Sequence, residues 1–203
     1  NSRAQDKLIE DGSFRQLFAE DRDCSAFVMS VDIRRSTELM LKARTPSAFA
    51  EFISLVTREL YSCVVKNYGV FDKFTGDGVL AFFPEDFSGE DAAYSAIKAA
   101  SECHEVFDRI YRASRGSFTS VLTGIGLGIG IDYGVVRLLR VAEGLTVVGV
   151  PVVYACRMSG ANPKQTLLNQ PAYELVSEKF GKHVVISETV LDIKHEGQVL
   201  AYD

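Results

Sequence analysis

Residues 70–83 read VFDKFTGDGVLAFF, which is two short runs of strand-forming residues around the turn sequence TGDG. An Asp-Gly pair between runs rich in valine and aromatic residues is a strong signal of a β-hairpin. The sequence therefore predicts strands over 70–74 and 79–83, with Asp77 in the turn that joins them. A hairpin of this kind needs no function, so on this segment alone a plain structural turn is the simpler interpretation.

The segments outside the hairpin predict an alternation of strands and helices. An apolar run over 25–33 predicts a buried strand, and apolar residues at helical spacing predict long helices over 46–66 and 91–111. Two further strands are expected over 122–131 and 135–141, joined by a turn at Asp-Tyr-Gly. The order β-α-β-β-α-β predicts a ferredoxin-like α+β fold, which is an antiparallel sheet with helices on one face.

Shorter elements complete the predicted chain. We expect helices over 152–158 and 172–180, and extra C-terminal strands over 184–186 and 199–202. The polar and charged residues 1–23 predict a helical lead-in. Since no internal repeat or linker interrupts the remainder, we expect a single domain over 24–203.

Composition excludes several classes of protein. The formal net charge of -5 argues against a general nucleic-acid binder, which is usually basic. No apolar run approaches the roughly 18 residues that a membrane span needs, so we expect no direct membrane contact. The four cysteines are widely spaced without a C-x-x-C pair, which is typical of reduced thiols in a cytoplasmic protein.

The first predicted strand ends in an acid, Asp32, followed by IRRST over 33–37. A carboxylate at the end of a buried strand is costly unless something pairs with it. The following residues offer backbone N–H groups, hydroxyls and guanidinium groups, which suit a polyphosphate. The alternative is that Asp32 caps the next helix and the arginines are solvated.

Together, Asp32 and Asp77 suggest more than either does alone. In the predicted order the first strand and the hairpin lie side by side in one sheet, so these carboxylates could share two divalent ions, Mg²⁺ or Mn²⁺. Magnesium sites in nucleotide enzymes use one or two carboxylates together with substrate phosphates. Two metals can activate an attacking oxygen and stabilise a leaving pyrophosphate.

Four segments resemble the catalytic domain of class III nucleotidyl cyclases, and the resemblance extends from about residue 26 to the end. They are FVMSVDIRRST, FDKFTGDGVLAFF, GIGIDYGVV and VVGVPVVYACRM. The resemblance implies that Asp32 and Asp77 are the metal-binding aspartates, assisted by the carbonyl of Ile33. It also implies that Arg157 neutralises charge on the α-phosphate in the transition state.

The same resemblance implies the substrate contacts. Lys73 and Thr146 match the two positions that read the base, and Lys194 is a weaker match for a lysine that touches the triphosphate. The loop that holds the triphosphate matches Arg34, Arg35, Ser36 and Thr37. The family works as a head-to-tail dimer, in which one subunit gives the metal aspartates and the other gives the base-reading pair and the arginine. A homodimer with shared sites is therefore expected.

The chain departs from the family pattern at positions near the nucleoside part of the substrate. Val153 stands where the family usually has an asparagine that orients the ribose, and the acid after Gly149 is absent. Either the domain is a catalytically inactive nucleotide-binding module, or the nucleoside end has been rebuilt with bulky residues such as Tyr154, Phe71 and Phe74.

The second interpretation resembles the bacterial pyrimidine cyclases of anti-phage defence. These make cyclic UMP or cyclic CMP, which a separate effector protein detects. We therefore expect a pyrimidine nucleotide as the substrate, because a pocket for a pyrimidine must be narrower than one for a purine. The resemblance alone places UTP before CTP. An adenylate cyclase that makes cyclic AMP remains an alternative.

Glycines alternate along residues 124–130, inside a strand pattern and without the spacing of a dinucleotide-binding loop. Glycine in a strand often marks a close approach of another backbone. We assign this run to packing, with a dimer interface as one place for it.

Overall fold

The computed structural model describes residues 22–141, 144–193 and 197–203. Its first half follows the predicted order of elements: β1 (Asp23–Arg34), α4 (Pro46–Lys66), β2 (Val70–Phe74), β3 (Val79–Pro84), α6 (Ala92–Ala113) and β4 (Gly126–Val141). Neighbouring strands of this core pair antiparallel, with β1 between β3 and β4 and with β2 at the edge. The predicted ferredoxin-like α+β class is thus confirmed.

The sheet extends beyond this core towards the C-terminus. The further strands are β5 (Gly144–Val148), β6 (Thr166–Leu168), β7 (Glu188–Ile193) and β8 (Gly197–Tyr202). The strand order is β2-β3-β1-β4-β6-β8-β7, with β5 paired to the far end of β4. The prediction of a strand over 184–186 is wrong, because pairing begins only at Glu188, where β7 meets β8.

Shorter helices connect these strands. They are α3 (Ser36–Leu41), α5 (Glu85–Ser88), α7 (Val150–Met158) and α8 (Gln170–Phe180), with 3-10 turns at Gly89–Asp91 and Arg115–Ser117. None of the helices within the described residues is both long and apolar enough to cross a membrane. Of the predicted helical lead-in, residues 1–21 lie outside the described residues, and Asp23 already begins β1.

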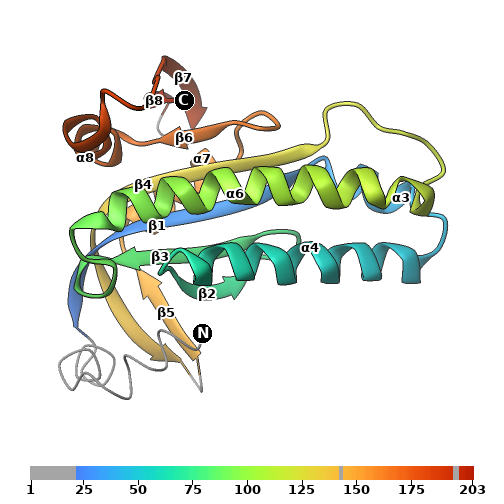
Figure 1. The fold of residues 1–203 in the computed structure, drawn as a ribbon, viewed down its shortest axis with the longest axis horizontal. Coiled ribbons are helices and arrows are strands. Elements are labelled where there is room, and N and C mark those ends of the chain that lie inside the picture. Colours follow the sequence, from blue (N-terminus) through green and yellow to red (C-terminus); the bar gives the residue numbers. More distant parts are fainter. Residues whose placement is uncertain (1–21, 142–143, 194–196) are drawn as a thin grey trace.

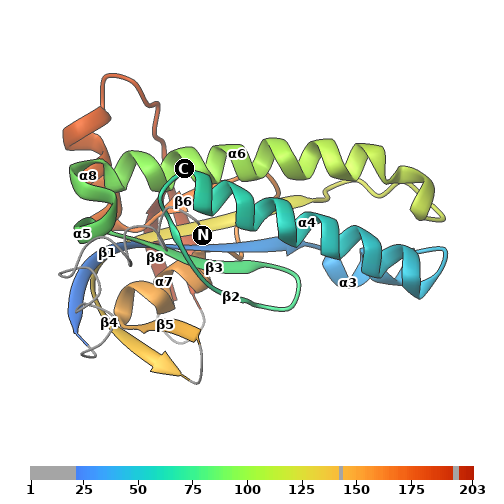
Figure 2. The same cartoon turned by 60° about the horizontal axis from the view of Figure 1, so that its bottom comes forward.

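Two long helices cover one face of the sheet, as Figures 1 and 2 show for α4 and α6. The alternation of side chains along β1 explains the layers. Phe27, Met29 and Val31 pack in the large core beneath α4 and α6, whereas Ala26 and Val28 pack in a second core with Ala155 of α7. The helix α7 therefore lies on the opposite face of the sheet.

Local signals explain where α4 begins. The side-chain oxygen of Thr45 accepts a hydrogen bond from the backbone N–H of Ala48 at 3.1 Å, and Pro46 occupies the first turn. Both features favour a helix start because they satisfy or remove backbone donors that lack a partner within the helix. The helix ends at Asn67, whose side chain donates to the carbonyl of Cys63.

One predicted turn is absent. Residues 132–134 lie inside β4, which pairs with β1 without interruption from Gly126 to Arg137. The long ladder and the ring contact between Phe27 and Tyr133, with centroids 4.7 Å apart, outweigh the local Asp-Tyr-Gly turn signal. The hairpin of this region is instead formed by β4 and β5, one strand later than expected.

The glycine run packs against a helix of the same chain. A Cβ atom added at Gly128 would lie 2.3 Å from the carbonyl oxygen of Ser159, and one added at Gly130 would lie 2.2 Å from that of Ala155. These distances are too short for any side chain, so α7 and its C-terminal end rest directly on the backbone of β4. The assignment to packing is confirmed for Gly128 and Gly130, with α7 and its C-terminal end as the partner, whereas an added Cβ at Gly126 would meet Pro163 instead.

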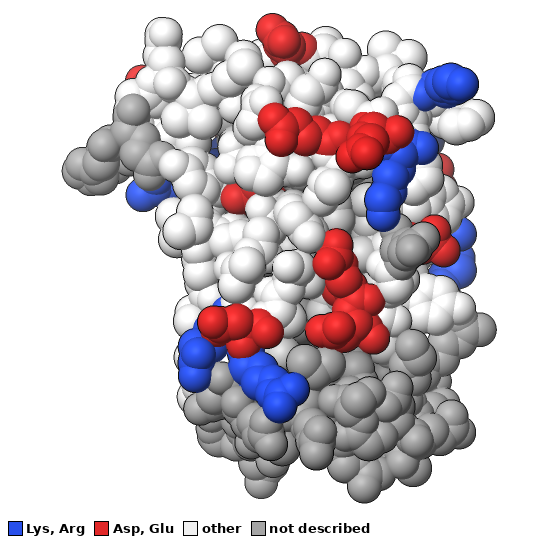
Figure 3. Space-filling view, turned by 90° about the vertical axis from the view of Figure 1, so that its left-hand side faces the viewer, with Lys and Arg blue, Asp and Glu red and all other residues white. Residues whose placement is uncertain are grey.

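Figure 3 shows the end of the molecule that lies at the left of Figure 1. Acidic side chains form several groups there, with basic side chains beside some of them.

Candidate active site

Asp32 and Asp77 come together where β1 meets the β2–β3 turn. Val31 pairs with Val79, which follows the turn directly, and the backbone of Gly78 lies against the Val31 carbonyl so closely that an added Cβ would be 1.9 Å from its oxygen. Both aspartates are partly buried. Burial raises the pKa of Asp32, and the nearby charge of Asp77 raises it further.

The arginines that follow Asp32 have different partners. Arg34 donates to a carboxylate oxygen of Asp32, and this contact opposes the rise in the pKa of that aspartate. Arg35 adopts a left-handed backbone conformation (φ 62°) just before α3, and its Nε donates to Glu38 at 2.8 Å while its Nη1 donates to the carbonyl of Thr123. Ser36 and Thr37 form the first turn of α3. Of the predicted triphosphate loop, Arg34 therefore lies nearest to the aspartates.

The donor set at this place fits a hard cation. The carboxylates of Asp32 and Asp77 are oxygen ligands, and the carbonyl of Ile33 belongs to the same strand end. Within the described residues no group of three or more His, Cys, Asp or Glu could hold a metal ion. Magnesium in nucleotide enzymes needs only one or two carboxylates, because substrate phosphates and waters complete its coordination.

Lys73 and Thr146 meet although 73 residues separate them in the chain. The Nζ of Lys73 on β2 donates to the Oγ1 of Thr146 on β5 at 2.8 Å. The Lys73 side chain is 51% exposed, so the ammonium group can reach a ligand as well as the threonine. The predicted pair is therefore assembled within one chain.

Asp72 joins this pair, and sequence reasoning missed it. One carboxylate oxygen accepts from the hydroxyl of Thr146 at 3.0 Å and from the backbone N–H of Val147 at 3.3 Å, and the other lies 3.5 Å from the Nζ of Lys73. The Asp72 side chain is only 1% exposed. An acid between two phenylalanines in a predicted strand, Phe71 and Phe74, was the signal that could have identified it.

The helix α7 carries two predicted site residues on its exposed side. Val153 is 45% exposed and Arg157, four residues later on the same helical face, is also exposed. Tyr154 points elsewhere: it lines a cavity of about 420 Å³ with Asp132, Asn169 and other residues, and neither Lys73 nor Thr146 lines that cavity. Lys194 lies outside the described residues.

The other bulky residues considered for the nucleoside end behave differently from one another. Phe71 packs its ring against Tyr61 of α4, with centroids 5.2 Å apart, and so contributes to the structure of the hairpin. Phe74 is 52% exposed and its ring packs against that of Phe71, with centroids 4.7 Å apart. Of these aromatic side chains, Phe74 is the one that faces solvent, although it lies with Phe71 and not with the Lys73–Thr146 pair.

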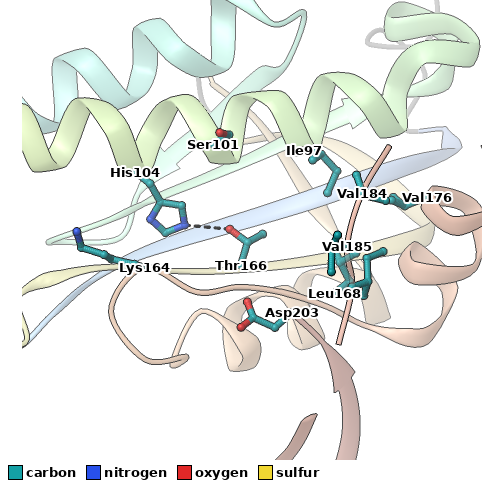
Figure 4. Close-up of a pocket in the computed structure, with 11 residues that line it drawn as sticks. Ile97, Ser101, His104, Lys164, Thr166, Leu168, Val176, Val184, Val185 and Asp203 are labelled. Carbon is teal, nitrogen blue, oxygen red and sulfur yellow. Dashed lines mark hydrogen bonds between the residues drawn. The ribbon is translucent and has the colours of Figure 1, made fainter. Parts of the chain in front are cut away.

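A separate cavity of about 270 Å³ lies between α6, β6 and residues 184–186 (Figure 4). His104 and Thr166 meet at its wall, with the Nε2 of His104 and the Oγ1 of Thr166 2.9 Å apart. The Nδ1 of His104 is buried and has no hydrogen-bond partner among the described residues. Burial lowers the pKa of His104. None of the predicted site residues lines this cavity.

No family model matches the chain. Two curated proteins, each named uncharacterized, from Mycobacterium bovis and Mycobacterium tuberculosis, are 32% identical over 191 residues, which is 89% of this chain. That match is 32% of either relative, so the chain spans about a third of the length of the curated proteins that it matches.

Solved structures give a more specific likeness. The adenylyl cyclase CyaB from P. aeruginosa has a TM-score of 0.74 and 20% identity, covering 89% of this chain and 93% of that one. The guanylyl cyclase Cya2 has a TM-score of 0.76 and 19% identity, covering 90% and 92%. The guanylate cyclase domain of RhGC from Catenaria anguillulae, solved with GTP, has a TM-score of 0.68 and 19% identity, covering 89% and 96%. The chain therefore has the fold of class III nucleotidyl cyclase catalytic domains.

Proposed function

We propose that this domain is a metal-dependent nucleotidyl cyclase, which converts a nucleoside triphosphate to its 3′,5′-cyclic monophosphate and pyrophosphate. The observation that carries the proposal is the meeting of Asp32 and Asp77, two partly buried carboxylates, in which the charge of Asp77 raises the pKa of Asp32. Such a pair is unfavourable unless cations neutralise it. The fold shared with adenylyl and guanylyl cyclases of known structure supports the same function.

Different residues of the chain have different roles in the proposed reaction. Two Mg²⁺ or Mn²⁺ ions held by Asp32, Asp77 and the Ile33 carbonyl would activate the ribose 3′ oxygen and neutralise the leaving pyrophosphate. Arg34, beside Asp32, binds the triphosphate through its guanidinium group, and the hydroxyls of Ser36 and Thr37 assist it. Lys194 is proposed as a further triphosphate contact. Since positioning and charge neutralisation can supply the catalysis, no covalent enzyme intermediate is needed.

The proposed active form is a homodimer with shared sites. In it, Arg157 neutralises the charge that develops on the α-phosphate bound by the partner subunit. Exposed apolar side chains lie on β4, β5 and α7, and a partner would bury them. They are Val135, Val141, Val148, Val150 and Val153.

We propose a pyrimidine nucleotide, UTP before CTP, as the substrate, and a cytoplasmic role in anti-phage defence in which an effector protein detects the product. Support comes from Val153, which has no polar group to orient a ribose. Since Tyr154 lines a different cavity of its own chain, it contributes less to this preference than the sequence suggested.

One observation favours a second candidate, an adenylate cyclase. The Lys73–Thr146 pair offers a donor and an acceptor side by side, and the edge of adenine carries the complementary groups. An inactive nucleotide-binding domain is the third candidate, with Val153 as its evidence.

The test is incubation of the purified protein with each of the four nucleoside triphosphates and Mn²⁺, followed by chromatography. We expect cyclic UMP and pyrophosphate, with cyclic CMP as the lesser product, whereas cyclic AMP alone would support the second candidate. Asp32→Ala and Asp77→Ala should lose turnover and keep the unfolding midpoint, and Asp192→Ala, at the exposed far edge of the sheet, should change neither. Wild-type turnover in either site variant would contradict the metal assignment.

A further inference from the structure

We infer that Asp72 is a positioning residue that fixes the hydroxyl proton of Thr146, so that Lys73 presents a donor and Thr146 an acceptor to the base. This inference rests on the proposed function, since it concerns how the same site recognises its nucleotide. It assigns a role to a residue that does not itself touch the substrate.

The backbone explains why Asp72 is buried beside an exposed lysine. In a regular strand, neighbouring side chains point to opposite faces. The register of β2 against β3 shifts between Phe71 and Lys73, so that Asp72 is the extra residue of a bulge. This irregularity lets Asp72 and Lys73 both reach Thr146 on β5. A bulge that redirects side chains in this way is typical of strands beside functional sites.

Counting protons fixes the direction of each hydrogen bond. An ammonium group can only donate and an ionised carboxylate can only accept, whereas a hydroxyl has one proton and two lone pairs. The Thr146 hydroxyl lies between the two groups, 2.8 Å from the Nζ of Lys73 and 3.0 Å from the carboxylate of Asp72. Its proton must therefore point to Asp72, and one lone pair accepts from Lys73.

The hydrogen-bonding groups that remain for a ligand are then defined. Thr146 keeps one lone pair and has no proton to offer. Lys73 keeps at least one N–H, because its other contacts are the threonine and the Asp72 oxygen at 3.5 Å. A base must therefore offer an acceptor to Lys73 and an N–H to Thr146. Uracil does so with a carbonyl and its ring N–H, and cytosine does so with its ring nitrogen and its amino group.

The backbone N–H of Val147 holds Asp72 in this orientation. It donates to the same carboxylate oxygen that accepts from Thr146, at 3.3 Å, and the side chain is almost fully removed from solvent. Hydrogen bonds to a charged group are stronger than neutral ones, and a buried carboxylate has few other orientations available. The threonine hydroxyl is thus held in one rotamer before any nucleotide arrives.

The experiment measures kcat and KM for the four nucleoside triphosphates with Mn²⁺ in Asp72→Ala, Asp72→Asn, Thr146→Val and the double variant Asp72→Ala/Thr146→Val. Asp72→Ala frees the hydroxyl proton, so KM for the preferred nucleotide should rise about tenfold, the loss of one charge-assisted hydrogen bond, while kcat stays within about threefold. Asp72→Asn keeps an oxygen acceptor and should recover most of the KM. The double variant should be no worse than Thr146→Val, because Asp72 acts through that hydroxyl.

The outcomes separate this inference from the proposed function. If the wild type forms no cyclic product and binds none of the four nucleotides, both fall together. If the wild type is active and Asp72→Ala keeps its KM within twofold for every nucleotide, only the inference falls. The inference also falls if Asp72→Asn raises KM as much as Asp72→Ala does. It falls as well if the effects of Asp72→Ala and Thr146→Val on KM add in the double variant, since a purely structural role would give those results. Should Asp72→Ala fail to fold, the contrast between Asp72→Asn and Thr146→Val decides.

Discussion

Substituting alanine for Gly78 should separate the two aspartates of the candidate active site. The added Cβ would lie 1.9 Å from the carbonyl oxygen of Val31 and 2.9 Å from its carbonyl carbon, and both of these are backbone atoms. An ordinary contact between carbon and oxygen is about 3.3 Å, so the turn and β1 must move apart by roughly 1.4 Å. Because Asp77 precedes Gly78 and Asp32 follows Val31, that movement also separates their carboxylates.

The cost of Gly78→Ala follows from the same contact. Overpacking a tight site costs about 1–3 kcal/mol, and weakening the adjoining backbone hydrogen bond adds about 1 kcal/mol. We therefore expect the free energy of unfolding to fall by about 2–4 kcal/mol. For a chain of this length that corresponds to a decrease in Tm of roughly 5–15 °C. Cyclase turnover should fall by at least about a hundredfold, since a misplacement on the order of 1 Å has effects of that size.

Two other glycines serve as controls. Gly76 lies in the same turn with nothing within 4 Å of an added Cβ, so Gly76→Ala should cost only the roughly 1–2 kcal/mol of its positive φ of 98°. Gly116 is open and has no positive φ, so Gly116→Ala should be close to neutral. Chemical denaturation and turnover of the three variants provide the comparison. A Gly78→Ala protein within about 0.5 kcal/mol of the wild type and with full turnover would show that this contact does not hold the two aspartates in place.

Further predictions concern the charged groups. Asp77→Asn should lower the pKa of Asp32 in metal-free protein, as measured by carboxyl NMR titration, and an unchanged pKa would contradict their proximity. A raised pKa means that the folded state holds the proton more tightly than the unfolded state. At pH values above the usual pKa of a carboxyl group, the aspartate pair therefore destabilises the fold, and Asp77→Asn should gain on the order of 0.5 kcal/mol in free energy of unfolding at pH 7. The pKa of His104 is lowered, chiefly by burial, so the unfolded chain binds more protons and the free energy of unfolding should fall as the pH drops below about 6.5. His104→Gln should weaken this pH dependence in chemical denaturation. The same pH dependence of stability in wild type and variant would count against the prediction. Mixing Asp77→Ala with Arg157→Ala subunits should restore about a quarter of wild-type turnover, because half of the dimers would hold one intact site of two. No rescue after proven subunit exchange would argue against shared sites.

Local patterns predicted the elements that depend on local interactions. The hairpin around Asp77 forms as its Asp-Gly signal indicates, and the apolar stripe of α4 places that helix correctly. The approach of Asp32 to Asp77 followed from the order of elements, because β1 pairs with β3 in that topology. These features need little information from distant parts of the chain.

Contacts between distant segments were harder to predict. The strand β5, which carries Thr146, was missed, because it exists as a partner of β4 and the turn signal at residues 132–134 suggested an earlier end to β4. Asp72 was missed because its role depends on a bulge, which shifts the alternation of side chains without a mark in the sequence. Tyr154 was grouped with Val153 by sequence position, although neighbouring helical residues point about 100° apart.

The packing of α7 against the backbone at Gly128 and Gly130 affects how such a site tolerates evolutionary change. The height of Arg157 above the sheet is set by contacts between main-chain atoms, which are the same whatever the side chains around them. Other residues can therefore be replaced without raising or lowering the arginine, provided that those two positions stay without a side chain. A likeness with a TM-score of 0.74 at 20% identity is compatible with this arrangement. The spacing of these two glycines therefore constrains the position of α7 in this chain in a way that percentage identity does not measure.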